Sequence, residues 1–239
     1  MKRLARILFT IIIFFCTVAA AFAQSIPFPG PGGVAAGSVS ILHTDTQTST
    51  SGASSYNFTA SLGTNPTSGR DIIVGVCDSA TGAPSVSSVT INSVSASQTA
   101  TAASSFNRVS FWIANVASGT TGVTISVGLG AAALRAAISV YATQNQHSTT
   151  ATATQNTTTN DTAMTLSSIS AAGIAVAMGC DNADVTNSWT GLSKDTDTQY
   201  GVTTISTASS AFGTAETNYN VTDNQSSATS PVFLTASFR

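Results

Sequence analysis

DIIVGVCDS (residues 71–79) and GIAVAMGCD (residues 173–181) are the two stretches on which the fold depends. Each is a short apolar run that ends in a cysteine followed by an aspartate, with Cys77 in the first run and Cys180 in the second. Short apolar runs that are bounded by turn residues are typical of buried β-strands. The sequence therefore predicts two similar strands, each with a cysteine near its end.

Apolar and polar residues alternate along most of the chain outside these two runs. The alternation is clearest in residues 56–60, 89–91, 109–113, 123–127 and 232–238. A period of two with many Val, Ile, Thr and aromatic residues is typical of half-buried strands. Turn signals such as TSGR and ASGTTG separate the runs. We therefore expect an all-β fold, a single-domain, antiparallel, jelly-roll-like β-sandwich of roughly a dozen short strands.

The N-terminus predicts a secretory signal peptide over residues 1–23. Three cations precede an apolar stretch at residues 7–20, and small residues lead up to Ala23. The stretch is shorter than the roughly 20 residues of a spanning helix. We expect cleavage after Ala23 and no membrane span after cleavage; a retained anchor is the alternative.

The rest of the chain divides into an arm and a sandwich domain. Residues 24–38 are rich in Pro and Gly and predict an extended arm or linker, either a disordered tail or a segment that docks on a neighbouring subunit. Residues 39–239 form the predicted sandwich. Within it, residues 147–165 are of low complexity and predict either a flexible connection or an exposed edge strand. Similarity between the parts on either side fades beyond the cysteine-ended runs, so the sequence predicts no internal repeat.

The charge pattern excludes some classes of partner. The chain has only 8 Lys and Arg against 10 Asp and Glu, and three of the cations lie in the signal peptide. Binding to phosphates or to anionic lipid needs clustered cations, so we expect no nucleic-acid partner and no membrane-surface binding. Sheet edges with few charges predict self-association or assembly with other structural subunits.

Export would place the cysteines where thiols oxidise. Cleavage of the signal removes Cys16 and leaves Cys77 and Cys180. If their strands are neighbours in one sheet or face each other across the sandwich, we expect a disulfide, which closes a long loop and stabilises by roughly 4–5 kcal/mol. Two buried free thiols are the alternative.

The sequence offers no catalytic constellation. There are only two histidines, His43 and His147, both in Ser- and Thr-rich surroundings, and no serine lies in a nucleophile-elbow pattern. We expect a protein that is not an enzyme and has no catalytic residues.

Two acidic motifs suggest a calcium site. Asp181 and Asp184 in DNAD, together with Asp195 and Asp197 in DTD, would bring hard oxygen ligands to one end of a sandwich. Ordinary turn chemistry is the alternative. No other cofactor is expected.

The two tryptophans suggest a carbohydrate site. Trp112 and Trp189 would stack on sugar rings if their indoles were exposed, whereas packing between sheets is the alternative. A cell-surface glycan is therefore an expected ligand class.

Several segments, taken in order, resemble a known domain. They are GRDIIVGV, SVTINSVSAS, FWIANVASGTTGVTISV, RAAISVYAT, GIAVAMG, SWTGL and FLTASFR. From residue 69 to the end, the chain resembles a β-sandwich domain of virion structural proteins, head- or tail-associated, of tailed bacteriophages and prophages. The resemblance rests on strand order and on the aromatic residues Trp112, Tyr141 and Trp189. The secretion signal departs from it, because virion proteins assemble in the cytoplasm.

Together these features predict a non-enzymatic structural or attachment module, either exported or virion-associated. The alternative is a secreted carbohydrate-binding domain. The expected location is extracellular or on the cell surface, or in the virion if the gene belongs to a phage.

Overall fold

The computed structural model describes residues 38–64, 70–117, 119–146, 148–184, 186–225 and 229–239. The predicted signal peptide (residues 1–23), Cys16, His147 and all of the arm except Ser38 lie outside the described residues. Every regular element in the described part is a β-strand, and every strand pairing in it is antiparallel. The all-β, antiparallel class predicted by period-two alternation is confirmed.

Residues 38–239 form one compact unit with two runs of strands. The strands of the first half are β1 (Ser40–Ser49), β2 (Ala53–Ala60), β3 (Asp71–Ser79), β4 (Val86–Ile91), β5 (Val94–Ser95), β6 (Ser97–Ala103), β7 (Asn107–Asn115), β8 (Val123–Ala133) and β9 (Arg135–Gln144). The strands of the second half are β10 (Ala153–Thr157), β11 (Met164–Ile169), β12 (Gly173–Asp181), β13 (Ser188–Thr190), β14 (Ser193–Tyr200), β15 (Thr203–Phe212), β16 (Glu216–Asn224) and β17 (Val232–Phe238). The total exceeds the expected dozen because short or polar strands such as β5, β13 and β14 lack a clear apolar alternation.

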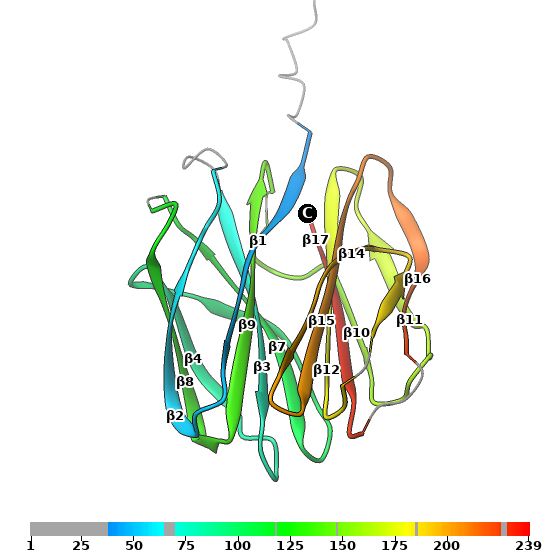
Figure 1. Ribbon diagram of the computed structural model, residues 1–239. Coiled ribbons are helices and arrows are strands. Elements are labelled where there is room, and N and C mark those ends of the chain that lie inside the picture. Colours follow the sequence, from blue (N-terminus) through cyan, green and yellow to red (C-terminus); the bar gives the residue numbers. More distant parts are fainter. Residues whose placement is uncertain (1–37, 65–69, 118, 147, 185, 226–228) are drawn as a thin grey trace, which may run out of the picture. The chain divides into compact units, whose positions relative to one another are not determined.

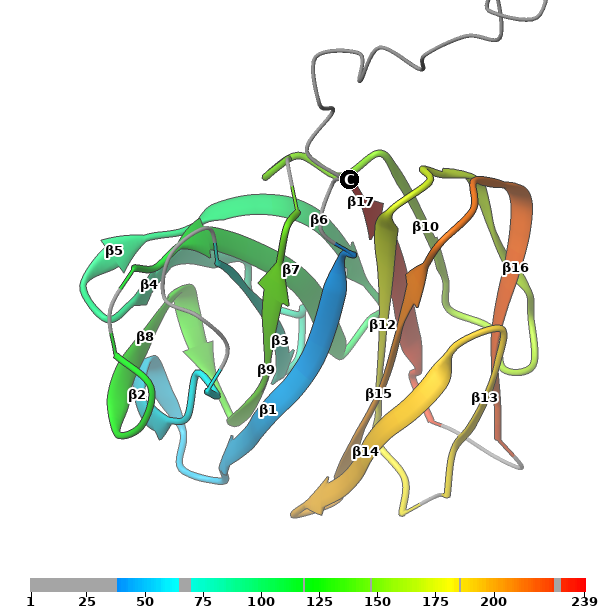
Figure 2. The ribbon, with the colours of Figure 1, turned by 90° about the horizontal axis from the view of Figure 1, so that it is seen from above.

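Four sheets lie in four layers, seen from above in Figure 2. Outer sheet 1 has the strand order β2-β8-β4-β5, and inner sheet 1 has the order β1-β9-β3-β7-β6. Inner sheet 2 has the order β10-β17-β12-β15-β14, and outer sheet 2 has the order β11-β16-β13. A separate hydrophobic core fills each of the three spaces between successive sheets.

The two cysteine-ended strands are the central strands of the inner sheets. In β3, Ile72 and Val74 face outer sheet 1, whereas Ile73 and Cys77 face inner sheet 2. A strand covered on both faces needs apolar residues at nearly every position, which explains the continuous apolar run. All residues of β3 and of β12 are buried.

The two halves, which lie on the left and on the right of Figure 1, have the same topology. The order of inner sheet 1 becomes that of inner sheet 2 when each strand is replaced by its counterpart in the second half. The counterparts of β1, β9, β3, β7 and β6 are β10, β17, β12, β15 and β14. The same substitution converts β2-β8-β4 into β11-β16-β13. Each half is a jelly-roll-like sandwich of eight strands if β5 and β6, which only Ala96 separates, count as one. The repeat that the sequence did not predict is thus present in the strand order.

The two halves pack against each other through their inner sheets and are related by approximate two-fold symmetry. β1 packs against β14, and the equivalent edge strand β10 packs against β6. The strand registers make Cys77 equivalent to Cys180 and Gly75 equivalent to Met178. Each of these pairs is also in contact across the interface. An approximate two-fold axis therefore runs between β3 and β12.

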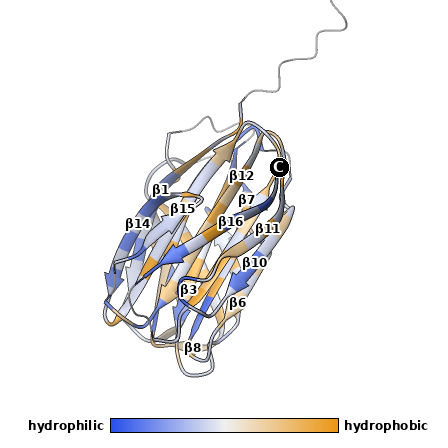
Figure 3. Ribbon diagram, turned by 90° about the vertical axis from the view of Figure 1, so that its right-hand side faces the viewer, coloured by the Kyte–Doolittle hydropathy of each residue, from blue (hydrophilic) through white to orange (hydrophobic). Residues whose placement is uncertain are grey.

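The low-complexity segment contains a strand at a sheet edge. Residues 153–157 form β10, which pairs only with β17, as the edge-strand alternative predicted. Figure 3 colours the edge strands β10 and β14 largely hydrophilic, whereas β12, the central strand of the same sheet, is hydrophobic. No helix long and apolar enough to cross a membrane occurs among the described residues.

Candidate functional site

The centre of the molecule is a disulfide between the equivalent cysteines Cys77 and Cys180. The two Cα atoms are 6.1 Å apart, within the range that a disulfide spans, and both side chains are fully buried. The hydroxyl of Tyr200 lies 2.7 Å from Cys77 Sγ, and burial raises the pKa of this phenol above its usual value. The predicted pairing is therefore present, with the strands facing each other from the two inner sheets.

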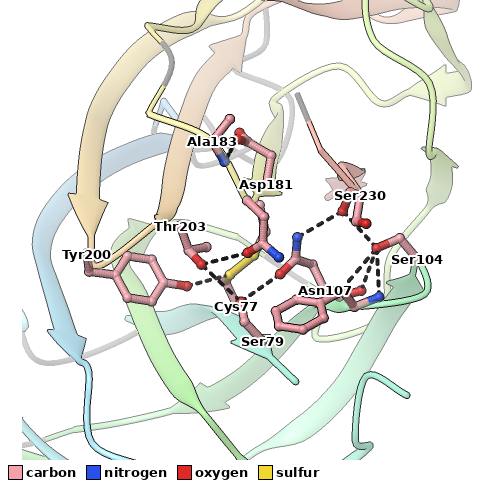
Figure 4. Close-up of a disulfide and its surroundings, with 12 residues drawn as sticks. Cys77, Ser79, Ser104, Asn107, Asp181, Ala183, Tyr200, Thr203 and Ser230 are labelled. Atoms are coloured by element: carbon pink, nitrogen blue, oxygen red, sulfur yellow. Dashed lines mark hydrogen bonds between the residues drawn. A yellow bond between two sulfur atoms is a disulfide. The ribbon is translucent and has the colours of Figure 1, made fainter. Parts of the chain in front are cut away.

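A polar network ties the two halves together beside the disulfide (Figure 4). Ser104 Oγ and Asn107 Nδ2 of the first half both donate to the carbonyl oxygen of Ser230 in the second half, at 2.8 Å. Ser79 Oγ donates to Asn107 Oδ1 at 2.6 Å and lies 3.5 Å from Thr203 Oγ1. The interface between the halves thus combines a covalent bond, an apolar core and buried hydrogen bonds.

The two tryptophans differ in how much of the indole is exposed. Trp112 is 6% exposed and belongs to the core between outer sheet 1 and inner sheet 1, where its indole N–H donates to Ser110 Oγ at 2.9 Å. Trp189 is half-buried against the third core and donates to Ser206 Oγ at 2.8 Å. Trp112 therefore follows the packing alternative, which corrects its assignment as a ligand-stacking residue.

The four aspartates expected to bind calcium do not converge on one point. Asp197 accepts hydrogen bonds from the backbone and side chain of Asn187, a residue that also bonds to Asp181. Asp195 instead interacts with Tyr141 and Ser209 in the space between the inner sheets, because a bulge between Lys194 and Thr196 interrupts the alternation of β14.

Asp184, the fourth member of the expected set, is exposed. Within the described part of the chain, no three His, Cys, Asp or Glu side chains are grouped so that they could hold a metal ion. Of the four aspartates expected to bind calcium, only Asp181 and Asp197 share a neighbour, because both interact with Asn187.

Buried carboxylates are a feature that the sequence analysis missed. Asp78 and Asp223 are 0% and 2% exposed, and neither carboxylate has a hydrogen-bond partner among the residues that the structure describes. Burial raises the pKa of Asp78 to about 7, which Arg108 partly opposes, and burial together with Asp181 and Asp197 raises the pKa of Asp223 to about 8. The signal was available for Asp223, because it continues the inward-facing alternation of β16.

The outer sheets present hydroxyl and amide groups to the outside. The strands of outer sheet 1 contain no charged residue, and outer sheet 2 has only Glu216 and the inward-facing Asp223. On the first sheet Ser126 Oγ donates to Asn57 Oδ1 at 2.6 Å, and on the second Thr165 Oγ1 donates to Asn220 Oδ1 at 2.7 Å. Both outer faces are therefore polar, hydrogen-bonding and almost uncharged.

A pocket of about 390 Å³ lies along β1 and β2. Its lining consists mainly of Ser, Thr, Asn and Gln with two aromatic residues: Gln47, Thr48, Ser49, Ser51, Ala53, Ser55, Tyr56, Asn57, Phe58 and Thr59. It contains no charged residue, so its chemistry suits a neutral polar ligand rather than an ion.

No family model, no curated protein and no solved structure matches this chain.

Proposed function

We propose that the chain is a non-enzymatic structural or attachment module, exported to the cell surface or the medium, or part of a virion if the gene belongs to a phage. Its resemblance to virion structural proteins of tailed phages supports the proposal. The observation that carries it is the disulfide-linked pair of equivalent sandwiches, whose nearly uncharged outer sheets are the first and last of four layers.

A rigid block with two similar outer faces suits attachment. Linking two binding faces makes the second contact intramolecular, so avidity exceeds the affinity of either face when both can engage. Three packed cores and a disulfide hold the geometry between the faces constant. The expected partners are a second copy of the chain, other structural subunits or a surface glycan.

The test places one charge on each outer face and measures attachment. The double variant Asn57→Asp/Asn220→Asp changes an exposed residue on each outer sheet, and Val202→Asp, in the exposed turn between β14 and β15, is the matched control. Wild type and control should co-sediment with cells or particles that carry the gene, and the double variant should be released, with all three melting alike. A wild-type chain that remains a free monomer beside those cells and particles would overturn the proposal.

The pocket along β1 and β2 supports carbohydrate binding as a second candidate function. Hydroxyl and amide groups around Tyr56 match the hydrogen-bonding pattern of a neutral sugar. Calorimetric titration with a panel of neutral glycans tests it, with Asn57→Ala as the pocket variant and Asn220→Ala as the control on the other outer sheet. Binding that Asn57→Ala weakens and Asn220→Ala leaves unchanged supports this function; no heat with any glycan excludes it.

A further inference from the structure

Four polar side chains are buried at the same end of the second sandwich, between inner sheet 2 and outer sheet 2. Asp181 ends β12, Asn187 precedes β13, Asp223 lies near the end of β16, and Gln225 follows that strand. Their exposed fractions are 0%, 1%, 2% and 5%. This group is named the Asp181–Asp223 cluster.

Oxygen atoms of the cluster lack hydrogen-bond partners among the described residues. They are Asp181 Oδ2, Asn187 Oδ1, both carboxylate oxygens of Asp223, and Gln225 Oε1. A buried polar atom without a partner costs about 1–3 kcal/mol, and a buried charge costs more. Five unpartnered oxygens in one group are therefore costly unless a proton or a cation neutralises the carboxylates.

The backbone is shaped to receive the Asp223 carboxylate. Its Oδ2 lies 2.8 Å from where a Cβ of Gly179 would be, so a larger residue at Gly179 would displace it. Asp181 is two residues further along β12 and projects from the same face of the strand as Gly179. The glycine thus makes room for one carboxylate beside another.

The cluster carries more negative than positive charge. Asp181, Asp197 and Asp223 repel one another, and the pKa of Asp181 is raised to about 7, mainly by burial. Lys194 Nζ is 2.9 Å from Asp197 Oδ2 and 2.6 Å from the carbonyl oxygen of Asn187. The one ammonium near the cluster in the described part of the chain is therefore engaged by Asp197 rather than by Asp181 or Asp223.

In the first sandwich, a cation lies across the strand pair from the carboxylate that is equivalent to Asp181. Asp78 is equivalent to Asp181, and its Cα partner across the strand pair is Arg108, whose charge favours the ionised carboxylate. The Cα partner of Asp181 is Thr204, which carries no charge. The second sandwich thus has no guanidinium at the strand position that Arg108 occupies in the first, and its buried Asp181 lies near a second buried carboxylate, Asp223.

We propose that the Asp181–Asp223 cluster binds a divalent cation, and that the cation is Ca²⁺. Two carboxylates and two amide oxygens are hard ligands of the type that Ca²⁺ prefers, and its flexible coordination accepts water at the remaining positions. The site differs from the expected set of Asp181, Asp184, Asp195 and Asp197, because it replaces three of those residues by Asn187, Asp223 and Gln225. A cation here would join β12 to β16 and hence inner sheet 2 to outer sheet 2.

Titration with Ca²⁺ at pH 8, followed by calorimetry and by thermal melting, tests the proposal. The wild-type chain should bind one Ca²⁺ and melt at a higher temperature with CaCl₂ than with EDTA. Asp181→Asn and Asp223→Asn, which keep the side-chain shape, should weaken Ca²⁺ binding by at least about tenfold. Asp78→Asn, the equivalent substitution in the first half, should bind Ca²⁺ like the wild type.

The same variants separate a cation site from a pair of protonated carboxyls. If protons alone neutralise the cluster, CaCl₂ and EDTA give the same melting curve at pH 8 and calorimetry shows no heat, which overturns the proposal. Equal Ca²⁺ binding by Asp223→Asn and wild type overturns it as well. Circular dichroism of each variant in EDTA confirms folding before the comparison.

Discussion

Asp78 shows at the scale of one residue how burial changes a side chain's chemistry. It follows Cys77 directly, so the alternation of β3 turns its carboxylate into the core of the first sandwich. Burial raises its pKa from 3.8 to about 7. The sequence motif of a cysteine followed by an aspartate gave an expectation for the cysteine only. The burial of the aspartate follows from the continuation of β3 to Ser79, with both faces of the strand covered.

Replacing Asp78 by Asn should change how stability depends on pH. A carboxyl whose folded-state pKa is raised favours the folded state below about pH 4, and that contribution is lost as pH rises through about 7. Asp78→Asn has no such dependence, so its advantage over wild type should grow from pH 5 to pH 8, reaching on the order of 1–3 kcal/mol. Urea unfolding of both proteins across this range measures it; a constant difference would show that Asp78 titrates normally.

At the scale of the element, period-two alternation predicted the strands that have one face in a hydrophobic core and the other in solvent. β2 and β8 have one buried and one exposed face, and their residues alternate accordingly. β14 is an edge strand with the sequence SKDTDTQY and a bulge, so its polar residues gave no signal. Its partner strand and its bulge are tertiary features, which local sequence does not specify.

The inner sheets explain why the repeat was not visible in the sequence. Equivalent positions hold side chains of different size: Phe111 corresponds to Thr207, Tyr141 to Ala236, and Gly75 to Met178. Around a two-fold axis, equivalent residues meet or neighbour one another, so a large side chain on one strand requires a small one on the other. Packing complementarity has thus removed the sequence similarity and kept the topology.

Substitutions at Gly75 and Met178 test this complementarity between β3 and β12. A Cβ on Gly75 would lie 2.7 Å from Met178 Sδ, so Gly75→Ala should destabilise by about 1–3 kcal/mol. Met178→Ala should cost about 2–5 kcal/mol by leaving a cavity. The double variant should be more stable than the sum of the two losses implies, as urea unfolding can show. Additive losses would contradict the contact.

The edge strands differ in the number of charged residues that oppose edge-to-edge association. β14 carries Lys194, Asp195 and Asp197, whereas β10 and β6, which pack together, carry no charge. Gln155→Lys on the exposed part of β10 should reduce self-association and change the free energy of unfolding by less than about 0.5 kcal/mol. Gln199→Lys on β14 is the control. Sedimentation velocity in which both variants behave like the wild type would contradict association through β10.

At the scale of the whole molecule, the disulfide joins two sandwiches that already share an apolar interface. It closes a loop of 103 residues, for which chain entropy gives a stabilisation of roughly 4–5 kcal/mol. The single variants Cys77→Ala and Cys180→Ala should therefore each lower the free energy of unfolding by about that amount or less. Both should keep the wild-type far-UV circular dichroism, because the three cores remain. A loss of all β-structure in either variant would show that the halves do not hold together without the bond.

Peptide mapping of the native, unreduced protein after trypsin digestion tests the central claim most directly. Cleavage after Arg70, Arg108, Arg135 and Lys194 leaves Cys77 in the peptide of residues 71–108 and Cys180 in that of residues 136–194. If the two equivalent strands face each other across the molecule, the digest should contain one species in which these two peptides are linked by the disulfide. Reduction should separate that species into the two peptides. Two free thiols, or cysteines linked only between chains, would contradict the face-to-face arrangement of the two halves.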